Sequence, residues 1–314
     1  MEIDLDRLQA FEDQLNPAAP EQGTVPVQIL GYGEISAVFR IESMPDIAFK
    51  RLPPFPSPQQ RTAYQNVIET YIHTLKQQLD VDVVASQCIA IDNRDGEHIL
   101  YVAQPILPAG TVGNQFLRRA SAAEYEAFWR ELLRHLLRIW RKNAADGPGE
   151  LIGIDAQVSN WAVKAADGHQ ITLQYFDITT PFLRHFGKEM LNPEIFLKAV
   201  PSFLVWLVRW AFLQDVLDRY YDLRSVLIDC LANLYKEKLA ERLPEGLRIV
   251  NDVLQTEARD LDIKPISEQE LRKYYKEDAF IWTIFLAFRR LDRFLKTRLL
   301  GKKYQFILPG PIER

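Results

Sequence analysis

Three polar side chains in the middle of the chain have the types and the spacing to bind a metal ion. Asp155 and Asn160 lie five residues apart in the stretch GIDAQVSNWAV, 153–163, and Asp177 follows the alternating run 171–176. Such alternation is typical of a strand, so this acid is expected at the rim of a sheet. Two carboxylates and an amide oxygen, gathered by one hairpin, would form a hard-oxygen site that suits Mg²⁺. Taken singly, each residue is equally typical of a turn or a cap.

A second group of residues, nearer the N-terminus, has the types that bind phosphate. Gly31 and Gly33 lie between two strand-like runs, where glycine permits a tight turn and lets backbone N–H groups approach a ligand closely. Alone, this pair predicts only a hairpin turn. Lys50 lies in the apolar run IAFKRL, and Glu69 follows on the next predicted helix, where its carboxylate could pair with the ammonium and hold it toward a phosphate. His73, one turn later, is an equally plausible inward polar group, and we favour Glu69.

The elements that must position these residues change in type along the chain. A short helix and a linker come first, and a β-rich part with one helix follows. A long helix then begins at a Ser-x-x-Glu capping signal, and after one more hairpin the pattern is helical. The order predicts an α+β protein with a small N-terminal antiparallel sheet lobe and a larger, mainly helical C-terminal lobe. The expected segments are 1–26 for the helix and linker, 27–107 for the N-terminal lobe and 108–314 for the C-terminal lobe.

Composition limits the classes of function. The chain has 314 residues, 47% of them hydrophobic, and a net charge of −4, which gives no general attraction to nucleic acid or to an anionic membrane. Cys88 and Cys230 are the only cysteines, so a disulfide framework is excluded and a reduced compartment is expected. The acidic N-terminus does not resemble a signal peptide. The most apolar run, 199–213, contains Arg209 and is shorter than the roughly 20 residues of a membrane span. We therefore expect a cytoplasmic protein without a membrane partner.

Together, in this order, these motifs resemble those of the protein-kinase-like superfamily. The resemblance covers residues 27 to 182. The short N-terminal lobe and the lack of an Ala-Pro-Glu sequence are similar to the aminoglycoside and choline kinase branch. The matching positions are Gly31, Gly33, Ser36 and Val38 for the glycine-rich loop, Lys50 for the strand lysine, Glu69 for the helix glutamate, Asp155 and Asn160 for the catalytic loop, and Asp177 for the metal-binding aspartate.

The resemblance implies a bilobal fold with ATP between the lobes and the adenine against the backbone near Gln104, Ile106 and Leu107. It implies that the glycine-rich loop covers the phosphates, that Lys50 binds them, and that Asn160 and Asp177 hold Mg²⁺. Asp155 would accept the proton of an acceptor hydroxyl. The implied activity is transfer of the γ-phosphoryl group of ATP to a small-molecule acceptor, with positioning and charge neutralisation providing most of the catalysis.

The sequence departs from the family pattern near both aspartates. Gly153 stands where a histidine usually precedes the catalytic aspartate, and Ile178 and Thr179 replace the usual residues after the metal-binding one. These changes keep open a pseudokinase that senses nucleotide or binds a protein partner. Transfer of another nucleotide-derived group, such as AMP, on the same fold is a third possibility.

Overall fold

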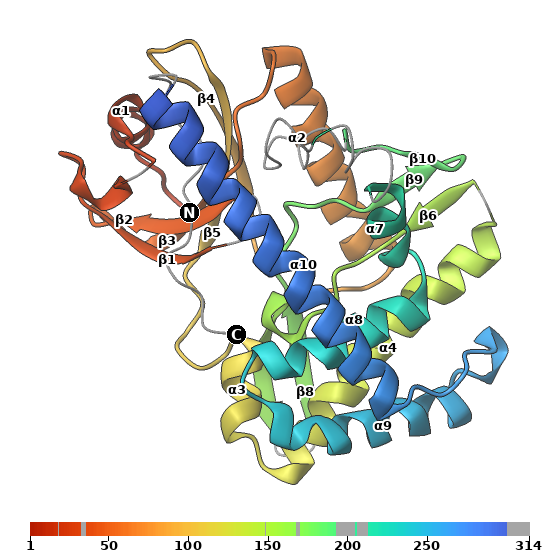
Figure 1. The fold of residues 1–314 in the computed structure, drawn as a ribbon. Helices are drawn as coiled ribbons and strands as arrows, with labels where there is room; N and C mark the ends of the chain where they lie inside the picture. Colours follow the sequence, from red (N-terminus) through yellow and green to blue (C-terminus); the bar gives the residue numbers. More distant parts are fainter. Residues whose placement is uncertain are drawn as a thin grey trace.

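The computed structural model describes residues 1–17, 19–32, 36–147, 149–167, 170–192, 205 and 213–299. Gly33 and most of the apolar run 199–213 lie outside the described residues. The predicted α+β class is confirmed, since an N-terminal antiparallel sheet is followed by a larger, mainly helical part (Figure 1). No helix in the described ranges is both long enough and apolar enough to cross a membrane.

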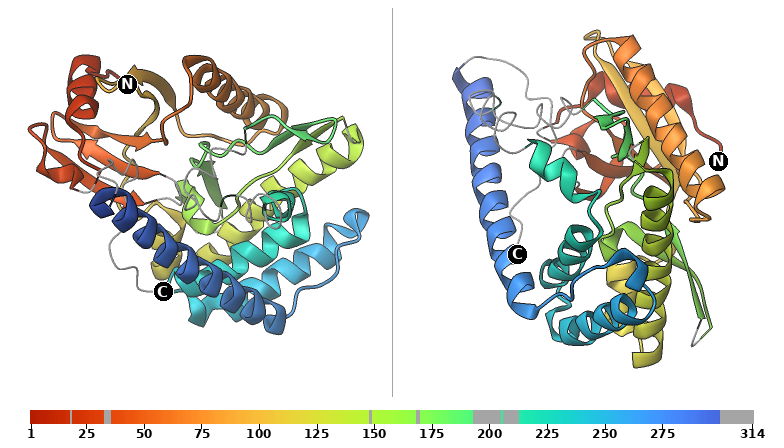
Figure 2. Two further views of the ribbon diagram at one scale, coloured as in Figure 1. Left: turned by 45° about the horizontal axis from the view of Figure 1, so that its top comes forward. Right: turned by 90° about the vertical axis from the view of Figure 1, so that its right-hand side faces the viewer.

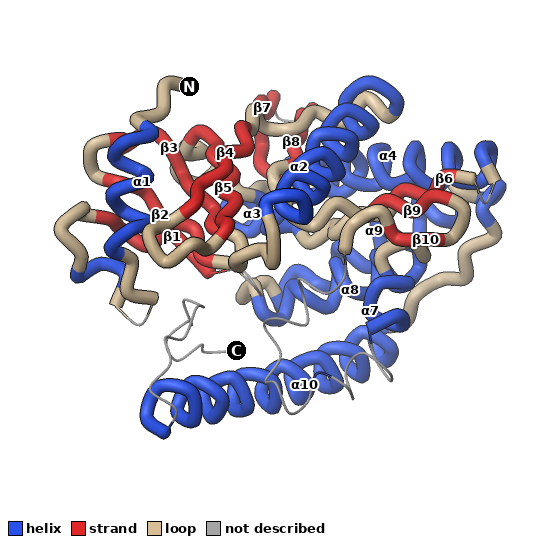
Figure 3. The backbone as a smooth tube through the Cα atoms, turned by 90° about the horizontal axis from the view of Figure 1, so that it is seen from above, coloured by secondary structure: helices blue, strands red, loops and turns tan. Residues whose placement is uncertain are grey.

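The N-terminal sheet has five antiparallel strands in the order β1-β2-β3-β5-β4. Because side chains alternate along each strand, Phe39 and Phe49 lie on the same face of the sheet, and Leu8 and Phe11 of α1 pack in one cluster with them. Figure 3 shows α1 beside the sheet. The N-terminal helix is thus part of the same hydrophobic cluster as the sheet. The bounds are Leu5–Gln14 for α1, Val27–Tyr32 for β1, Ala37–Ile41 for β2, Met44–Arg51 for β3, Gln87–Asp92 for β4 and His98–Pro105 for β5.

A buried ion pair fixes α1 to the sheet. The Glu12 carboxylate accepts two hydrogen bonds of 2.7 Å from the guanidinium of Arg51 on β3, and the Tyr101 hydroxyl also donates to it. Both charged side chains are almost inaccessible to solvent. Arg51 directly follows Lys50, so α1 contributes to holding the strand that carries the candidate phosphate-binding lysine.

The other face of the sheet meets α2, Pro58–His73, which continues into one wide turn, Thr74–Gln78. Ser57 caps this helix by accepting the N–H of Gln60, and proline occupies its first turn. Its buried stripe includes Tyr64, Ile68 and Tyr71, which belong to the large cluster shared with the C-terminal part.

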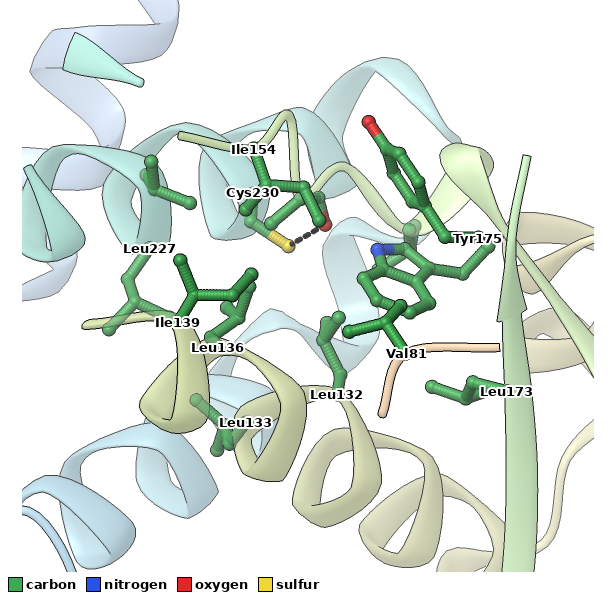
Figure 4. Packing of buried hydrophobic residues seen from close by; sticks show 14 of the residues in the cluster. Val81, Leu132, Leu133, Leu136, Ile139, Ile154, Leu173, Tyr175, Leu227 and Cys230 are labelled. Carbon is green, nitrogen blue, oxygen red and sulfur yellow. Dashed lines mark hydrogen bonds between the residues drawn. The ribbon is translucent and has the colours of Figure 1, made fainter. Parts of the chain in front are cut away.

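The C-terminal part is built around α4, which begins at the predicted capping box between Ser121 and Glu124. Leucines of α4 pack against α8 and against the loop after β6, where the Cys230 thiol donates to the carbonyl of Ala156 at 3.0 Å (Figure 4). A small sheet with the strand order β10-β9-β6, which the sequence pattern did not predict, flanks this loop. The long helix α10 runs along one side of the molecule (Figure 2). The bounds are Gly113–Arg119 for α3, Ala122–Asp146 for α4, Glu150–Ile152 for β6, Trp161–Asp167 for β7, Gln170–Tyr175 for β8, Leu183–His185 for β9, Lys188–Glu189 for β10, Leu213–Arg219 for α7, Leu223–Lys236 for α8, Leu243–Thr256 for α9 and Glu268–Phe294 for α10.

Candidate functional site

The β7–β8 hairpin brings together the two residues that the sequence assigns to a metal. Its register pairs Trp161 with Tyr175, so the residues just outside this pair, Asn160 and Phe176, are neighbours at the open end. The Phe176 N–H donates to the Asn160 carbonyl at 3.1 Å, which continues the pairing by one step. Asp177 is the next residue, so it and Asn160 emerge at the same end of the hairpin.

Asp155 lies on the loop that leads into this hairpin. The Asn160 amide nitrogen donates to the Asp155 carbonyl at 3.3 Å, so the amide oxygen is the atom that can face a cation. The half-buried Asp155 carboxylate accepts the Gln157 N–H at 3.2 Å, which is the local turn contact expected of an aspartate in a loop. The turn role and a chemical role are compatible, because a carboxylate can accept several hydrogen bonds.

Gly153 lies where the backbone of another segment approaches the loop closely. A Cβ at this position would lie 2.6 Å from the carbonyl oxygen of Tyr220 and 3.0 Å from the Cβ of Phe182. The backbone is also tied on both sides, because the Gly153 N–H donates to Phe182 O at 2.9 Å and the Ile154 N–H to Tyr220 O at 3.2 Å. A side chain here would have to displace this backbone, so the close approach accounts for glycine at position 153.

Lys50 lies in a row of cross-strand partners on the face of the sheet opposite α1. The register places Gly31 beside Val38, Val38 beside Lys50, and Lys50 beside Val102, and cross-strand partners share a face. Gly31 and Val38 are half-buried and Ser36 is buried. Of the glycine-rich loop, the described residues therefore place Gly31 and Val38 on the same side of the sheet as the lysine.

The Lys50 ammonium donates to the Asp177 carboxylate at 2.7 Å, and the Thr179 hydroxyl donates to the same oxygen at 3.0 Å. Burial raises the pKa of Asp177, but the positive charge and hydrogen bond of Lys50 outweigh it, so the pKa lies below its ordinary value. The aspartate is thus ionised at neutral pH. The pair joins the N-terminal sheet to the hairpin, and its side chains keep 19% and 23% of their surface exposed.

The predicted contact between Lys50 and Glu69 is not formed. Glu69 is exposed and accepts a hydrogen bond of 2.8 Å from Gln65 on its own helix, while Lys50 bonds to Asp177. The reason is the phase of α2, since Glu69 follows the fully buried Ile68 by one residue, which is about 100° around a helix. His73, the other candidate on this helix, is also exposed.

Several hydrogen-bonding groups of the segment predicted to receive adenine are bonded to other parts of the protein. The Gln104 amide nitrogen donates to the Phe176 carbonyl and to the Ser86 hydroxyl, at 2.9 Å each. The Ile106 N–H donates to the Asp46 carbonyl at 2.8 Å and is not open to a base. Ile106 and Leu107 are half-buried. The side chain of Gln104 therefore links this segment to the residue that precedes Asp177.

A polar network that the sequence pattern did not indicate joins the Asp155 loop to α8 and α10. Gln157 donates to the Asp229 carboxylate at 3.2 Å and accepts from the Lys236 ammonium at 3.0 Å. Tyr274 of α10 donates to the same aspartate at 2.8 Å. Burial raises the pKa of Asp229. This network ties α8 and α10 to a residue two positions from Asp155.

The site also fits a small hard cation. Among the described residues, no group of three His, Cys, Asp or Glu side chains is arranged to hold a metal ion by itself. Mg²⁺ needs only one or two protein carboxylates, because waters and substrate phosphates complete its shell. Asp177, which is ionised, and Asn160, which emerges at the same end of the hairpin, are ligands of the types that this requirement names.

Residues 10–293 match the model of a family described as "Family of unknown function (DUF6206)". The chain belongs to this family. None of the curated proteins matches it.

Solved structures of aminoglycoside phosphotransferases are distant neighbours of the chain. The GDP complex of a point mutant of aminoglycoside 2'-phosphotransferase-IIIa has a TM-score of 0.36 at 12% identity, over 80% of this chain and 97% of that one. The GDP and kanamycin complex of APH(2'')-IIIa has a TM-score of 0.32 at 12% identity, over 81% and 100% of the two chains. Likeness at this level does not transfer a ligand or a substrate to the chain.

Proposed function

We propose that the chain is a kinase-like phosphotransferase that transfers the γ-phosphoryl group of ATP to a hydroxyl of a small-molecule acceptor. The observation that supports this most strongly is the ion pair between Lys50 and Asp177, at 2.7 Å, at the end of the hairpin that also carries Asn160. A lysine of β3 meets an aspartate of the β7–β8 hairpin there, and an asparagine emerges at the same end of that hairpin. This is the donor set that phosphoryl transfer requires for a charged, metal-bound triphosphate.

Each residue has a role that follows from its place. Lys50 supplies a positive charge to the phosphates, and Gly31 lies on its face of the sheet, in line with a phosphate-covering loop. Asp177 and Asn160 would hold Mg²⁺, which neutralises charge on the phosphates when bound. A carboxylate can accept several contacts, so Asp177 would hold the metal with Lys50 still beside it, and the ammonium would add its positive charge next to the phosphates.

Asp155 would accept the proton of the acceptor hydroxyl. The acceptor oxygen forms a bond to the γ-phosphorus, the bond from that phosphorus to the β,γ-bridging oxygen breaks, and ADP leaves. The proton moves to the Asp155 carboxylate. Because Gln157 is bonded to Asp229 and Lys236, the loop that carries this carboxylate is fixed to α8.

The experiment is magnesium-dependent ATP turnover measured together with MgATP affinity, in the parent protein and in Asp155→Asn. Asparagine retains the oxygen that accepts the Gln157 N–H but is a poor base. We expect turnover to fall by about 10²- to 10⁴-fold, as for loss of a general base, with nearly unchanged affinity. Asp4→Asn is the matched control, because Asp4 also accepts a backbone N–H, at the start of α1.

Four outcomes separate the alternatives. ADP as the product, lost in Asp155→Asn, supports phosphoryl transfer. AMP as the product points to nucleotidyl transfer on the same site, and tight MgATP binding without turnover points to a pseudokinase. If millimolar MgATP does not bind at all, the proposed nucleotide site is wrong.

A further inference from the structure

Helix α2 contacts the candidate site through two tyrosine hydroxyls. Tyr64 and Tyr71 are seven residues apart, which places them on the same face of the helix, and their exposed fractions are 3% and 0%. The Tyr64 hydroxyl donates to the backbone carbonyl of Thr179 at 2.8 Å. The Tyr71 hydroxyl donates to the backbone carbonyl of Gly153 at 2.9 Å.

The two carbonyls that receive these bonds have matching positions. Gly153 precedes Asp155 by two residues, and Thr179 follows Asp177 by two residues. One helix therefore holds the loop of the candidate base and the loop of the candidate metal ligand, each at the same distance along the chain from its carboxylate.

Helix α2 contacts the site through these two hydroxyls and not through the carboxylate of Glu69. Glu69 is exposed, so it contributes no charge to Lys50, and the phase of the helix presents phenols to the site. Burial, reinforced by the charge of Asp177, raises the pKa of Tyr64 and Tyr71 well above the ordinary value. Both hydroxyls therefore remain protonated donors throughout the physiological pH range.

We propose that Tyr64 and Tyr71 are positioning residues that couple α2 to the two loops of the candidate site. Their bonds fix the loops of Asp155 and Asp177 relative to one rigid helix and so set the distance between base and metal ligand. Displacement of α2 would break both bonds and release both loops together. The position of this helix would therefore determine the geometry of the site. The role in catalysis rests on the proposed function, whereas the mechanical coupling does not.

The coupling is tested by hydrogen exchange in Tyr64→Phe and Tyr71→Phe, which remove only the hydroxyls. Tyr125→Phe is the matched control, because its buried hydroxyl also donates to a backbone carbonyl, that of Arg242 at 2.9 Å, away from the site. We expect Tyr71→Phe to speed exchange in residues 152–156 and Tyr64→Phe to speed it in residues 178–183. The expected change is on the order of tenfold, equivalent to one hydrogen bond of about 1.4 kcal/mol.

A second readout separates positioning from general destabilisation. Tyr71→Phe should lower turnover more than MgATP affinity, because its loop carries the base, and Tyr64→Phe should lower MgATP affinity, because its loop carries the metal ligand. A merely structural role would lower both quantities in proportion to the folded fraction in all three variants.

The two proposals fail in different ways. If the parent protein binds no MgATP, the proposed function is wrong, yet the local changes in exchange still establish the coupling. If both tyrosine variants show loop exchange equal to that of Tyr125→Phe at matched global stability, the coupling is overturned, whatever the protein binds.

Discussion

The ion pair between Lys50 and Asp177 allows a quantitative prediction for Asp177→Asn. The substitution preserves shape but leaves the ammonium without its negative partner. Breaking a fully buried pair costs about 3–5 kcal/mol, whereas an exposed pair contributes about 0–1 kcal/mol. With 19% and 23% of the two side chains exposed, this pair falls between these limits. We therefore expect a loss of about 1–3 kcal/mol in the free energy of unfolding at pH 7.

The pH dependence gives this prediction a distinct signature. The pKa of Asp177 lies below its unfolded value of 3.8, so its contribution is present above that pH and is lost as the pH falls through the folded pKa. The difference between parent and variant should therefore be constant from pH 5 to 7 and shrink in acid below about pH 4. An uncharged hydrogen bond of the same size would give no such change.

Urea unfolding at several pH values measures the effect, with Lys50→Met and the double variant completing a cycle. Asp260→Asn is the control, because Asp260 pairs with Arg141 at the surface and its side chain is 51% exposed, so its loss should leave the unfolding curve unchanged. The reasoning is refuted if Asp177→Asn is as stable as the parent at pH 7. It is also refuted if the losses from the two single variants simply add in the double variant.

Three further predictions concern the framework around the site, and urea unfolding measures each. Gly153→Ala should cost about 2–4 kcal/mol, because its Cβ would meet a backbone carbonyl at 2.6 Å, whereas Gly31→Ala, with open space around its Cβ, should cost less than about 1 kcal/mol. Equal losses would contradict the close approach. Glu12→Gln should cost about 3–5 kcal/mol, because it removes the negative charge that accepts two hydrogen bonds from the buried guanidinium of Arg51. A loss below about 1 kcal/mol would contradict this. Burial raises the pKa of Glu131, but hydrogen bonds from His135 and Arg134 outweigh it and lower the pKa from 4.5 to about 2. The stability that the ionised Glu131 contributes should therefore be lost as the pH falls across that range. Glu131→Gln should remove this part of the pH dependence of the free energy of unfolding.

The sequence predicted the parts of the fold that depend on local signals. The capping box at Ser121, the α+β order and the hairpin that ends at Asp177 all follow from residue patterns a few positions long. The neighbouring positions of Asn160 and Asp177 were also predictable, because a hairpin register fixes which residues lie together at its open end.

The partner of Lys50 was not predictable in the same way. Whether Glu69 points toward Lys50 depends on the phase of α2 relative to the sheet, and tertiary packing sets that phase. A signal was present, since Tyr64, Ile68 and Tyr71 form an apolar stripe at helical spacing that excludes Glu69 from the buried face. The reason for Gly153 could not be read from the sequence at all, because the atom that excludes a side chain belongs to Tyr220, far along the chain.

The central claim is that the pair of Lys50 and Asp177 marks a nucleotide site. Calorimetric titration of MgATP into the parent protein and into Lys50→Met, at equal folded fraction, tests it most directly. We expect saturable binding in the parent and at least tenfold weaker binding in Lys50→Met. We also expect loss of most affinity in the parent when Mg²⁺ is left out, because in the proposed site Asp177 would contact the nucleotide only through the metal. Equal MgATP affinity in the two proteins, or no binding in the parent at millimolar concentration, would contradict the account.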